Sequence, residues 1–552
     1  MNNDNSVEVD SNEDFIKSSE QLDETTNSLS NQQDLTELFP DDYIPTEEEM
    51  DKIYQHLDFR IIPACWTLYF LASYGSSAYG NTLTMNSAAG HSLSQSLNLT
   101  THDKSTATAL YYVAYIIFDL PMNLIMTRAS PQVWLSRIIT GVGIVYICYA
   151  ALTNGSGLMA IRFMTGFADA GTWPGLSYYI SLWYPEHRIA RRVGYYFTAA
   201  QLSASAAGLV AAGFQKMDMD RGLYGWKWYY IVYGAVTIVV GISLIWWLPD
   251  RPGYLKTKDS SIFSLRKFIP ENIMKYFTPR QPLNDKERRL HYLDMRYRYK
   301  NTRWGLKDVG IILLDYRTWS LIMMYFGVVG TGFGLAVFAT TLIQVEHPSL
   351  SGIDVSLLYA PIWLFDLAAI IIFTPIADKF KKFRHVIFCF STMIIITGLL
   401  VTSYAHGPWN RYAGLLIAGF GLGPTVPITM TLATQIMAYR YGDVGCAASA
   451  AIISGLGNLG TVVATYALYT GWPADVERLF RDSNMMLIVM LGVSIISAII
   501  CWFIMERIDK GVYDNKAKEI EKDFERHVNT AQYSTSSQNS VSLEADSIKN
   551  RV

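Results

Sequence analysis

The sequence predicts an all-α polytopic membrane protein with twelve transmembrane helices in two six-helix halves. Half of the 552 residues are apolar and the mean hydropathy is +0.16, which is too hydrophobic for a soluble multidomain enzyme. The polar residues gather at the two ends of the chain, 1–59 and 511–552. Between these ends the chain falls into apolar blocks of roughly 20 residues, the length that spans about 30 Å of hydrocarbon. An internal repeat divides the blocks into two sets.

The predicted spans follow one another along the chain, and their even number places both termini on one side of the membrane. The N-terminal half contains the spans 61–83, 106–127, 132–152, 157–183, 192–213 and 228–248. The C-terminal half contains the spans 316–345, 355–377, 385–405, 411–438, 446–470 and 485–505. These spans predict five regions along the chain: a disordered N-terminal tail (1–59), an N-terminal half (60–248), a central loop (249–315), a C-terminal half (316–506) and a C-terminal tail (507–552).

Basic residues predict which side of the membrane each loop occupies. They cluster after the second, fourth and eighth spans and along the central loop: Arg128, Arg137, Arg188, Arg191, Arg192, Lys379, Lys381, Lys382, Arg384 and the segment 251–307. Because loops rich in Lys and Arg remain in the cytoplasm, we expect the central loop and both tails to be cytoplasmic. The glycosylation sequon at Asn98 falls in a loop of the opposite face, which agrees with this orientation.

The two halves contain matching stretches at equivalent places. GFADAGTWP (166–174), in the fourth span of the first half, matches GFGLGPTVP (419–427), in the fourth span of the second, at Gly, Phe, Thr and Pro positions. Duplicated halves with Gly- and Pro-softened helices are typical of transporters, in which two halves rock about a central site. The alternative is that these residues only permit close helix packing. Asp169 aligns with Leu422, so the acid is present in only one of the two halves. This difference favours a role for Asp169 in the transport path.

An acidic residue within a membrane helix costs about 2.5 to 3.5 kcal/mol and is a functional candidate by default. Asp366 lies in the most apolar surroundings, IWLFDLAAII, where a carboxyl group favours its protonated form. We therefore expect Asp366 to couple transport to protons, with a packing role as the alternative.

Other charged residues are candidates for a gate or a charge network. They are Asp119, Arg162, Asp169, Asp378 and Arg188. Arg162 lies about two helical turns before Asp169, so the two side chains should point to nearly the same face. Arg162 is also close to the outer end of its span, where its side chain could reach the membrane surface.

Neutral polar residues predict a polar cavity between the helices. The first span carries SYGSSAYGNTLTMN, which is too polar to face lipid, and other spans carry single amides. Hydrogen bonding between helices is the alternative for each residue taken alone. The candidates for substrate binding are Tyr74, Ser77, Asn81, Gln201, Gln344 and Asn458.

No pattern in the sequence predicts an enzyme. The chain has no P-loop, no Ser/His/Asp set at informative spacing and no His cluster that could hold a metal. Its five Cys residues lack paired or metal-ligand spacing. We therefore expect no cofactor, no metal, no ATP-driven pumping and no nucleic-acid partner.

Three stretches resemble a known family. RFMTGFADAGTWPGLSYYISLWYPEHRIARRVGYYFTAA (162–200), DLPMNLIMTRASPQVWLSR (119–137) and PIADKFKKFR (375–384) are similar to the fungal allantoate permease-like anion:cation symporters of the major facilitator superfamily. The resemblance covers most of residues 55–510. It implies the major facilitator fold and a plasma-membrane symporter that uses protons to import small anions.

The resemblance also assigns positions. The family's acids in helices 4 and 2 fall on Asp169 and Asp119, both shortened from the usual Glu. In helix 1, Gly75 and Ser76 stand where the family commonly has an Asp-Arg pair, and this stretch looks most like the branch that takes up sulfate and sulfonates.

We therefore expect a proton-coupled importer of a small anion, with inorganic sulfur oxyanions or sulfonates as the favoured substrates. A carboxylate vitamin or ureide, such as nicotinate, pantothenate or allantoate, is the alternative substrate. An alternative of another class is a nutrient receptor that keeps the transporter fold. The expected partners are the anion, a proton and the lipid bilayer.

Overall fold

The computed structural model describes residues 39, 43, 45–252, 282–296, 306–347, 349–380, 383–468, 475 and 477–508. The chain forms two compact units. One takes in Met1–Leu57, Gln281–Tyr299 and Asn515–Val552, and the other takes in Asp58–Arg280 and Lys300–Asp514. The second, larger unit contains all the predicted spans.

The described part of the smaller unit joins two helical segments. The first turns of α2 (Glu47–Thr82) lie against α11 (Asp285–Arg296), where the Tyr54 hydroxyl donates to Asp294 Oδ2 at 2.5 Å. Residues 47–59, which we expected in the N-terminal tail, are therefore helical, and so is part of the expected central loop.

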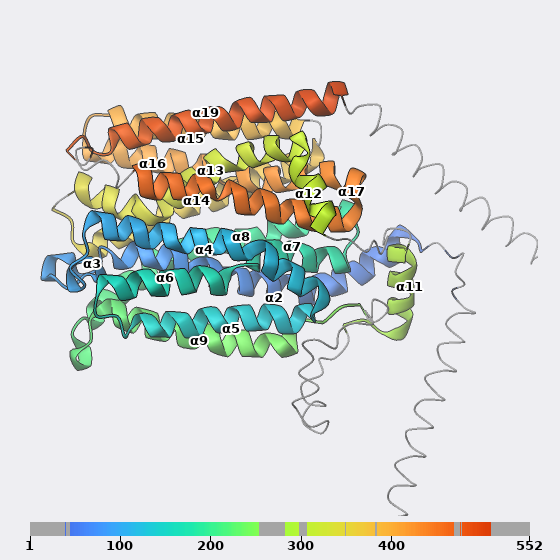
Figure 1. Ribbon diagram of the computed structural model, residues 1–552, viewed down its shortest axis with the longest axis horizontal. Helices are drawn as coiled ribbons and strands as arrows, with labels where there is room; N and C mark the ends of the chain where they lie inside the picture. The colour runs from blue at the N-terminus through green and yellow to red at the C-terminus, as the bar shows by residue number, and fades with distance from the viewer. Residues whose placement is uncertain are drawn as a thin grey trace, which may run out of the picture. The chain divides into compact units, whose positions relative to one another are not determined.

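The described part of the larger unit is a bundle of long helices that run side by side (Figure 1). The N-terminal half contains the rest of α2 and α4 (Thr101–Arg128), α5 (Pro131–Tyr149), α6 (Gly155–Asp169), α7 (Thr172–Trp183), α8 (Glu186–Phe214) and α9 (Gly225–Trp247). The C-terminal half contains α12 (Leu306–Leu314), α13 (Tyr316–Glu346), α14 (Gly352–Lys379), α15 (Arg384–Tyr404), α16 (Pro408–Leu422), α17 (Thr425–Gly457), α18 (Leu459–Val462) and α19 (Arg481–Phe503). Short helical turns lie between or after them: η1 (Ser87–Ala89), α3 (Leu93–Ser96), η2 (Gln215–Met217), η3 (Asp220–Gly222), η6 (Val463–Leu468) and η8 (Ile504–Ile508).

Capping boxes fix the starts of two equivalent helices. At α4 the Asp103 N–H donates to Thr100 Oγ1 at 3.2 Å, and the Thr100 N–H donates back to the Asp103 carboxylate at 2.9 Å. Ser351 and Asp354 form the same reciprocal pair at α14. These boxes satisfy backbone N–H groups that a helix start leaves free. We call the end of the bundle at which α4 and α14 begin the distal end, and the opposite end the proximal end.

Small residues bring neighbouring helices close together. A Cβ atom at Gly234 of α9 would lie 2.7 Å from the carbonyl oxygen of Gly143 of α5. In the C-terminal half, a Cβ atom at Gly398 of α15 would lie 2.7 Å from the carbonyl oxygen of Gly414 of α16. Close approach of this kind replaces the hydrophobic driving force that helices lack inside a membrane.

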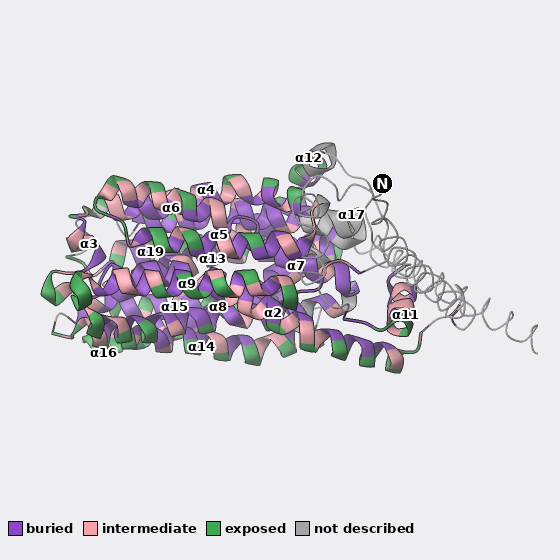
Figure 2. Ribbon diagram, turned by 90° about the horizontal axis from the view of Figure 1, so that it is seen from below, coloured by how far each residue is buried: buried purple, intermediate pink, exposed green. Residues whose placement is uncertain are grey.

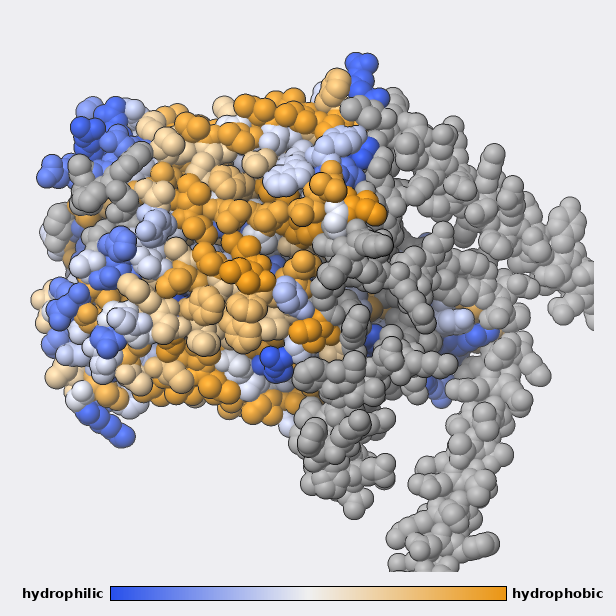
Figure 3. All heavy atoms as spheres, in the orientation of Figure 1, coloured by the Kyte–Doolittle hydropathy of each residue, from blue (hydrophilic) through white to orange (hydrophobic). Residues whose placement is uncertain are grey.

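Nine helical segments of the described residues are long and apolar enough to cross a membrane. Figure 3 shows apolar side chains over the middle of the bundle, and Figure 2 shows buried residues along its interior. The predicted spans 61–83, 106–127 and 157–183 do not reach this standard. The first two carry many polar residues, and the third is divided into α6 and α7, each shorter than a full span.

One connection differs from the prediction. α17 runs without interruption from the second part of the tenth predicted span into the eleventh, which α18 and the π-helical turn η6 complete. Spacing alone predicted a loop between 438 and 446, and the backbone there is helical instead.

Candidate functional site

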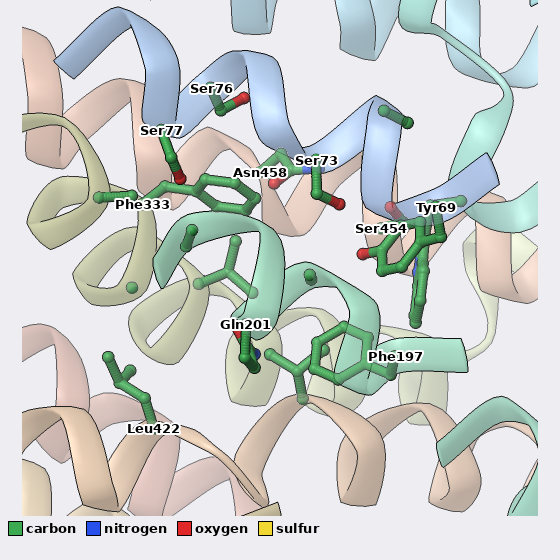
Figure 4. A pocket seen from close by; sticks show the side chains of 18 of the residues that line it. Tyr69, Ser73, Ser76, Ser77, Phe197, Gln201, Phe333, Leu422, Ser454 and Asn458 are labelled. Atoms are coloured by element: carbon green, nitrogen blue, oxygen red, sulfur yellow. The ribbon is translucent and has the colours of Figure 1, made fainter. Parts of the chain in front are cut away.

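A cavity lies between the two halves of the larger unit (Figure 4). Its empty space, including the solvent at its opening, is about 1080 Å³. Its walls come from α2, α4, α6, α7 and α8 of the N-terminal half and from α13, α14, α16 and α17 of the C-terminal half. Both halves therefore contribute to one candidate binding site.

Aromatic side chains make up much of the wall. They are Tyr69, Tyr111, Tyr112, Tyr115, Trp173, Phe197, Tyr325, Phe333 and Trp363. Among the described lining residues, Asp169 and Asp366 carry the only carboxyl groups, and Lys, Arg and His are absent. Such a wall gives an organic molecule extensive apolar contact and leaves its orientation to a few polar groups.

The fourth predicted span is broken next to the acid that made it unusual. α6 ends at Asp169 and α7 begins at Thr172, because Ala170 leaves the helix with a ψ of 136° and Gly171 has a φ of +88°. Glycine adopts this left-handed conformation without the cost that a Cβ atom brings. Asp169 lines the cavity, where its Oδ2 accepts the Tyr111 hydroxyl at 2.6 Å and its Oδ1 accepts the Thr172 hydroxyl at 3.1 Å.

Asp119 supports this break from the neighbouring helix. The side chain lies on α4, is 1% exposed, and its Oδ1 accepts the Gly171 N–H at 3.0 Å. The Asn123 side-chain amide donates to the same oxygen at 3.4 Å. Because the break frees the Gly171 N–H from the helical ladder, a buried acceptor at this point satisfies it. Asp119 does not line the cavity.

Asp366 lies on α14, is 1% exposed and lines the cavity. Within the described part of the chain, its Oδ1 has no hydrogen-bond partner. A Cβ atom at Gly423, between α16 and α17, would lie 2.8 Å from that oxygen, so the glycine makes room for the carboxyl group. The carboxyl group is therefore buried, adjacent to the cavity and available to a ligand.

The Arg162 side chain is buried against two tyrosine rings. It is 1% exposed, and its guanidinium carbon lies 3.9 Å from the ring centroid of Tyr79 and 4.8 Å from that of Tyr111. No described carboxylate lies within ion-pair distance of it. Tyr111 connects Arg162 to Asp169. Its ring faces the Arg162 guanidinium group, and its hydroxyl donates to the Asp169 carboxylate.

Three of the predicted substrate-binding residues line the cavity: Ser77, Gln201 and Asn458. Figure 4 shows Ser77 on α2, Gln201 on α8 and Asn458 beyond them. Ser73 and Ser76 also lie on the α2 wall, so the polar stretch of the first span faces the cavity rather than lipid.

The other three predicted substrate-binding residues lie away from the described cavity wall. Tyr74 packs on the ring of Tyr233 with centroids 4.7 Å apart. The Asn81 side-chain amide donates to a carbonyl one turn earlier in α2 at 2.9 Å. The Gln344 amide donates to Ser87 Oγ at 2.8 Å, which joins the two halves near the distal end. Selecting polar residues within the spans therefore found residues that bond within the protein as well as residues that line the cavity.

The charged residues at the proximal end form contacts within one half. Arg192 of α8 donates to both carboxylate oxygens of Asp58, at 2.6 and 2.7 Å, and to the carbonyl oxygen of Arg188 at 2.8 Å. Arg188 therefore contributes a carbonyl oxygen to this group of contacts, and Arg192, one turn later, forms the ion pair with Asp58. Asp378 lies in the last turn of α14, and its side chain is outside the described residues.

Sequence reasoning missed the aromatic residues of the wall. Tyr111, Trp173 and Trp363 line the cavity, and the indole N–H groups of both Trp residues have no partner among the described residues. Aromatic residues are common in membrane helices, so their type alone carried no signal. Trp363 lies one turn before Asp366 on the same helix face, and this spacing could have identified Trp363 as a cavity residue.

We expect Tyr111→Phe to reduce stability and alter the cavity without unfolding the bundle. The substitution removes the hydroxyl that donates to Asp169 and keeps the ring that faces Arg162. Loss of a hydrogen bond to a charged group costs about 1.5 to 3 kcal/mol. Thermal unfolding in detergent checks this, with Tyr316→Phe at the exposed start of α13 as the control. Equal unfolding temperatures for the two variants would contradict the assigned contact.

Comparison with known proteins gives both a family and individual relatives. The sequence profile of the Major Facilitator Superfamily matches residues 65–465. Vitamin H transporter 1 of Schizosaccharomyces pombe is 45% identical, with 81% of this chain and 79% of the relative covered. A putative tartrate transporter of Agrobacterium vitis is 24% identical, with 87% of this chain and 98% of the relative covered.

A solved structure has the same fold. It is a bacterial homolog of the human lysosomal transporter Spinster, in an inward-facing and occupied conformation. The TM-score is 0.54 at 13% identity, and the match covers 80% of this chain and 96% of that chain. At this identity the likeness concerns the fold alone.

Proposed function

Because the chain belongs to the major facilitator superfamily, we propose that it is a proton-coupled importer of a small carboxylate, with vitamin H (biotin) as the favoured substrate. The chain is an integral membrane transporter of small molecules and not an enzyme.

The observation that carries the substrate proposal is the wall of the cavity. It combines aromatic rings with neutral donors and acceptors from different helices, such as Ser77 on α2, Gln201 on α8 and Ser454 on α17. A substrate with a bulky, weakly polar ring system and a polar group at each end fits this wall better than a compact inorganic anion does. Biotin has this character, and a relative at 45% identity is named for its transport.

The structure weakens the argument for a sulfur anion. That argument rests on Gly75 and Ser76, which replace a charged pair. A Cβ atom at Gly75 would lie 1.8 Å from the hydroxyl oxygen of Tyr146, whose ring is buried among other tyrosines. Glycine is required there for packing, so the missing acid follows from the neighbouring ring and does not indicate a substrate. Sulfate and sulfonates are therefore the second candidates.

Coupling to protons is proposed on the position of Asp366. This carboxyl group is buried in the wall of the cavity without a described hydrogen-bond partner, so it can gain or lose a proton as the site is exposed to either side. We place both termini in the cytoplasm and the protein in the plasma membrane, on the basic loops and the family resemblance. The distal end then faces the outside.

Gln215 is expected to hold the distal end closed. Its side-chain amide donates to the Gly352 carbonyl at 3.2 Å and to Ser356 Oγ at 3.0 Å, across the two halves. Since a hydrogen bond contributes about 1 kcal/mol, Gln215→Ala should shift the populations of open and closed states by about fivefold. The rate at which an impermeant thiol reagent labels a cysteine placed at Ser76 should rise accordingly.

The matched control is Gln95→Ala. Gln95 also lies at the distal end, but its amide bonds within the N-terminal half, to the Ser87 carbonyl. Labelling at Ser76→Cys should stay at the parent rate in this variant. A Gln215→Ala protein that labels no faster than the control would remove Gln215 from the closure.

Uptake into cells that lack their own carriers tests the proposed function. Labelled biotin is compared with nicotinate, allantoate, sulfate and an alkylsulfonate, at acidic and neutral pH and with a protonophore. We expect biotin uptake that is faster at acidic pH and collapses with the protonophore. Uptake of sulfate or a sulfonate in place of biotin would favour the second candidate. Loss of a nutrient response on removal of the tails, with no flux for any compound, would indicate a receptor.

A further inference from the structure

Asp119 and Asp366 lie in the same sequence triplet on corresponding helices of the two halves. The triplets Phe118-Asp119-Leu120 and Phe365-Asp366-Leu367 are identical, and each is followed by a threonine at the same distance, Thr127 and Thr374. Asp119 lies 19 residues after the capping residue Thr100 of α4, and Asp366 lies 15 residues after the capping residue Ser351 of α14. Both halves therefore carry an acid on this helix, at positions about one helical turn apart.

The two acids meet different backbones. Asp119 accepts the N–H of Gly171, at a break where the chain leaves the helix. The residue that aligns with Gly171 in the second half is Pro424, which has no N–H to donate. The chain there also keeps helical angles, with φ and ψ of −45° and −59° at Gly423 and −77° and −14° at Pro424. The second half therefore offers Asp366 no equivalent backbone donor.

A second unpaired group lies beside Asp366. Trp363 precedes it by one helical turn on α14, and the two side chains therefore lie on the same face of the helix. Both line the cavity, Trp363 is 5% exposed, and its indole Nε1 forms no hydrogen bond of full geometry among the described residues, with the Tyr359 hydroxyl as its neighbour. An N–H donor and a carboxyl group thus border the cavity together, buried and unsatisfied. Buried polar atoms of this kind are normally paired, so a ligand is the natural partner for both.

We propose that Trp363 Nε1–H and the protonated carboxyl group of Asp366 form the subsite for the carboxylate of the substrate. This inference rests on the proposed function and deepens it. Each group donates one hydrogen bond to the substrate carboxylate, and the proton that Asp366 supplies is the proton that is transported. The substrate and the proton therefore bind together at one place.

The charge of the cavity supports this assignment. A carboxylate placed in a cavity without Lys, Arg or His among its described lining residues needs another source of positive charge. Protonation of Asp366 removes a negative charge from the site and turns an acceptor into a donor. Asp169 is less suited to this role because two hydroxyl groups, of Tyr111 and Thr172, already donate to its carboxylate.

The charged and titratable groups on the helices around α14 are engaged elsewhere. Arg192 of α8 pairs with Asp58, Arg384 of α15 donates to the Ala377 carbonyl, Arg411 of α16 donates to the Ala405 carbonyl, and the Tyr412 hydroxyl donates to the Leu358 carbonyl. Other described titratable groups on these helices are Arg188, Arg191, Tyr195 and Tyr196 of α8, Tyr316, Arg317, Tyr325 and Glu346 of α13, and His385, Cys389 and Tyr404 of α15. None of these described groups forms a hydrogen bond or ion pair with Asp366. Its proton is therefore free to respond to the ligand.

The first test uses the full-length protein in proteoliposomes with labelled biotin. Asp366→Asn keeps an N–H donor for the carboxylate but cannot carry a proton. It should exchange biotin across the membrane, fail to accumulate it against a gradient, and take it up equally at acidic and neutral pH. Asp366→Leu lacks the donor as well, and its KM should rise by about tenfold or more.

Two further variants separate the subsite from a general effect on structure. Trp363→Phe keeps the ring and loses the N–H, so its KM for biotin should rise by about fivefold to tenfold while the pH profile stays unchanged. Asp119→Asn alters a buried acid outside the cavity wall, and whatever activity it retains should keep the pH dependence of the parent protein.

A second test changes the ligand. The biotin analogue that carries a primary ammonium group in place of the carboxylate has only N–H donors there, so it should bind best when Asp366 is deprotonated. Its potency as an inhibitor of biotin uptake should rise from acidic to neutral pH, whereas the potency of unlabelled biotin should fall.

The outcomes distinguish the two levels of the proposal. A parent protein that does not transport biotin would refute the proposed function itself. If the parent transports biotin with protons but Asp366→Asn keeps the pH dependence, the subsite is wrong and the proposed function stands. The subsite is equally wrong if the ammonium analogue and biotin respond to pH in the same direction.

Discussion

Replacement of Gly166 by valine is expected to prevent the bundle from forming its native helix contacts. A Cβ atom at this position would lie 2.1 Å from the carbonyl oxygen of Tyr111 and 3.0 Å from the Cβ of Ala114, both on α4. A backbone oxygen cannot move aside as the end of a side chain can, so α4 and α6 must separate. Overpacking of this kind costs about 1 to 3 kcal/mol or more. We expect loss of the monodisperse detergent-solubilised protein, measured by size-exclusion chromatography and thermal unfolding.

Gly141→Val is the matched control for this prediction. Gly141 is also in the interior of a membrane helix, α5, but a Cβ atom there would meet nothing within 4 Å. The two substitutions change helix propensity equally, so the difference between them reports the contact between α4 and α6. A Gly166→Val protein as stable as the control would contradict the observed approach of these helices.

Replacement of Asp119 by leucine is expected to remove most of the transport activity and to lower stability. The Gly171 N–H would lose its acceptor while remaining buried, which costs about 1 to 3 kcal/mol. The break between α6 and α7 would then lose the contact that holds it, and Asp169 at the end of α6 would lose its fixed position in the cavity wall. Uptake and the unfolding temperature, measured on the same preparation, check both effects.

Asp119→Asn is the comparison that isolates the hydrogen bond. Asparagine keeps a side-chain oxygen that can accept the Gly171 N–H, so this variant should retain more activity and a higher unfolding temperature than the leucine variant. Equal losses in the two variants would show that the charge of Asp119, and not its support of the break, is what transport requires.

The fold was predictable because its signals are strong and repeated. Blocks of apolar residues predicted twelve spans in two halves, and the major facilitator fold confirms this class. The break at Gly171 was signalled only by an unusual composition, since the left-handed φ that divides α6 from α7 depends on the acceptor that Asp119 provides from another helix. The continuity of α17 was not predicted because the residues between the two expected spans lack the apolar side chains on which span prediction relies.

The site was predictable only in part, because polarity inside a membrane helix has two causes. Ser77 and Gln201 are polar where they face the cavity, whereas Asn81 and Gln344 are polar where they tie parts of the chain together. A sequence does not distinguish these cases, since each requires the position of a residue on a different helix. Trp363 escaped notice for the opposite reason: its side chain counts as apolar, and only its buried, unpaired N–H distinguishes it.

The polar character of α2 and α4 has a consequence for how the protein is made. Helices that fall short of the hydropathy of a membrane span gain little from entering lipid one at a time as they leave the ribosome. Their polar faces are sheltered only after α13, α14 and α17 have been synthesised and have closed the opposite wall of the cavity. Until those helices are made, the N-terminal half exposes the polar faces of α2 and α4 to lipid, to the translocation machinery and to quality-control proteases.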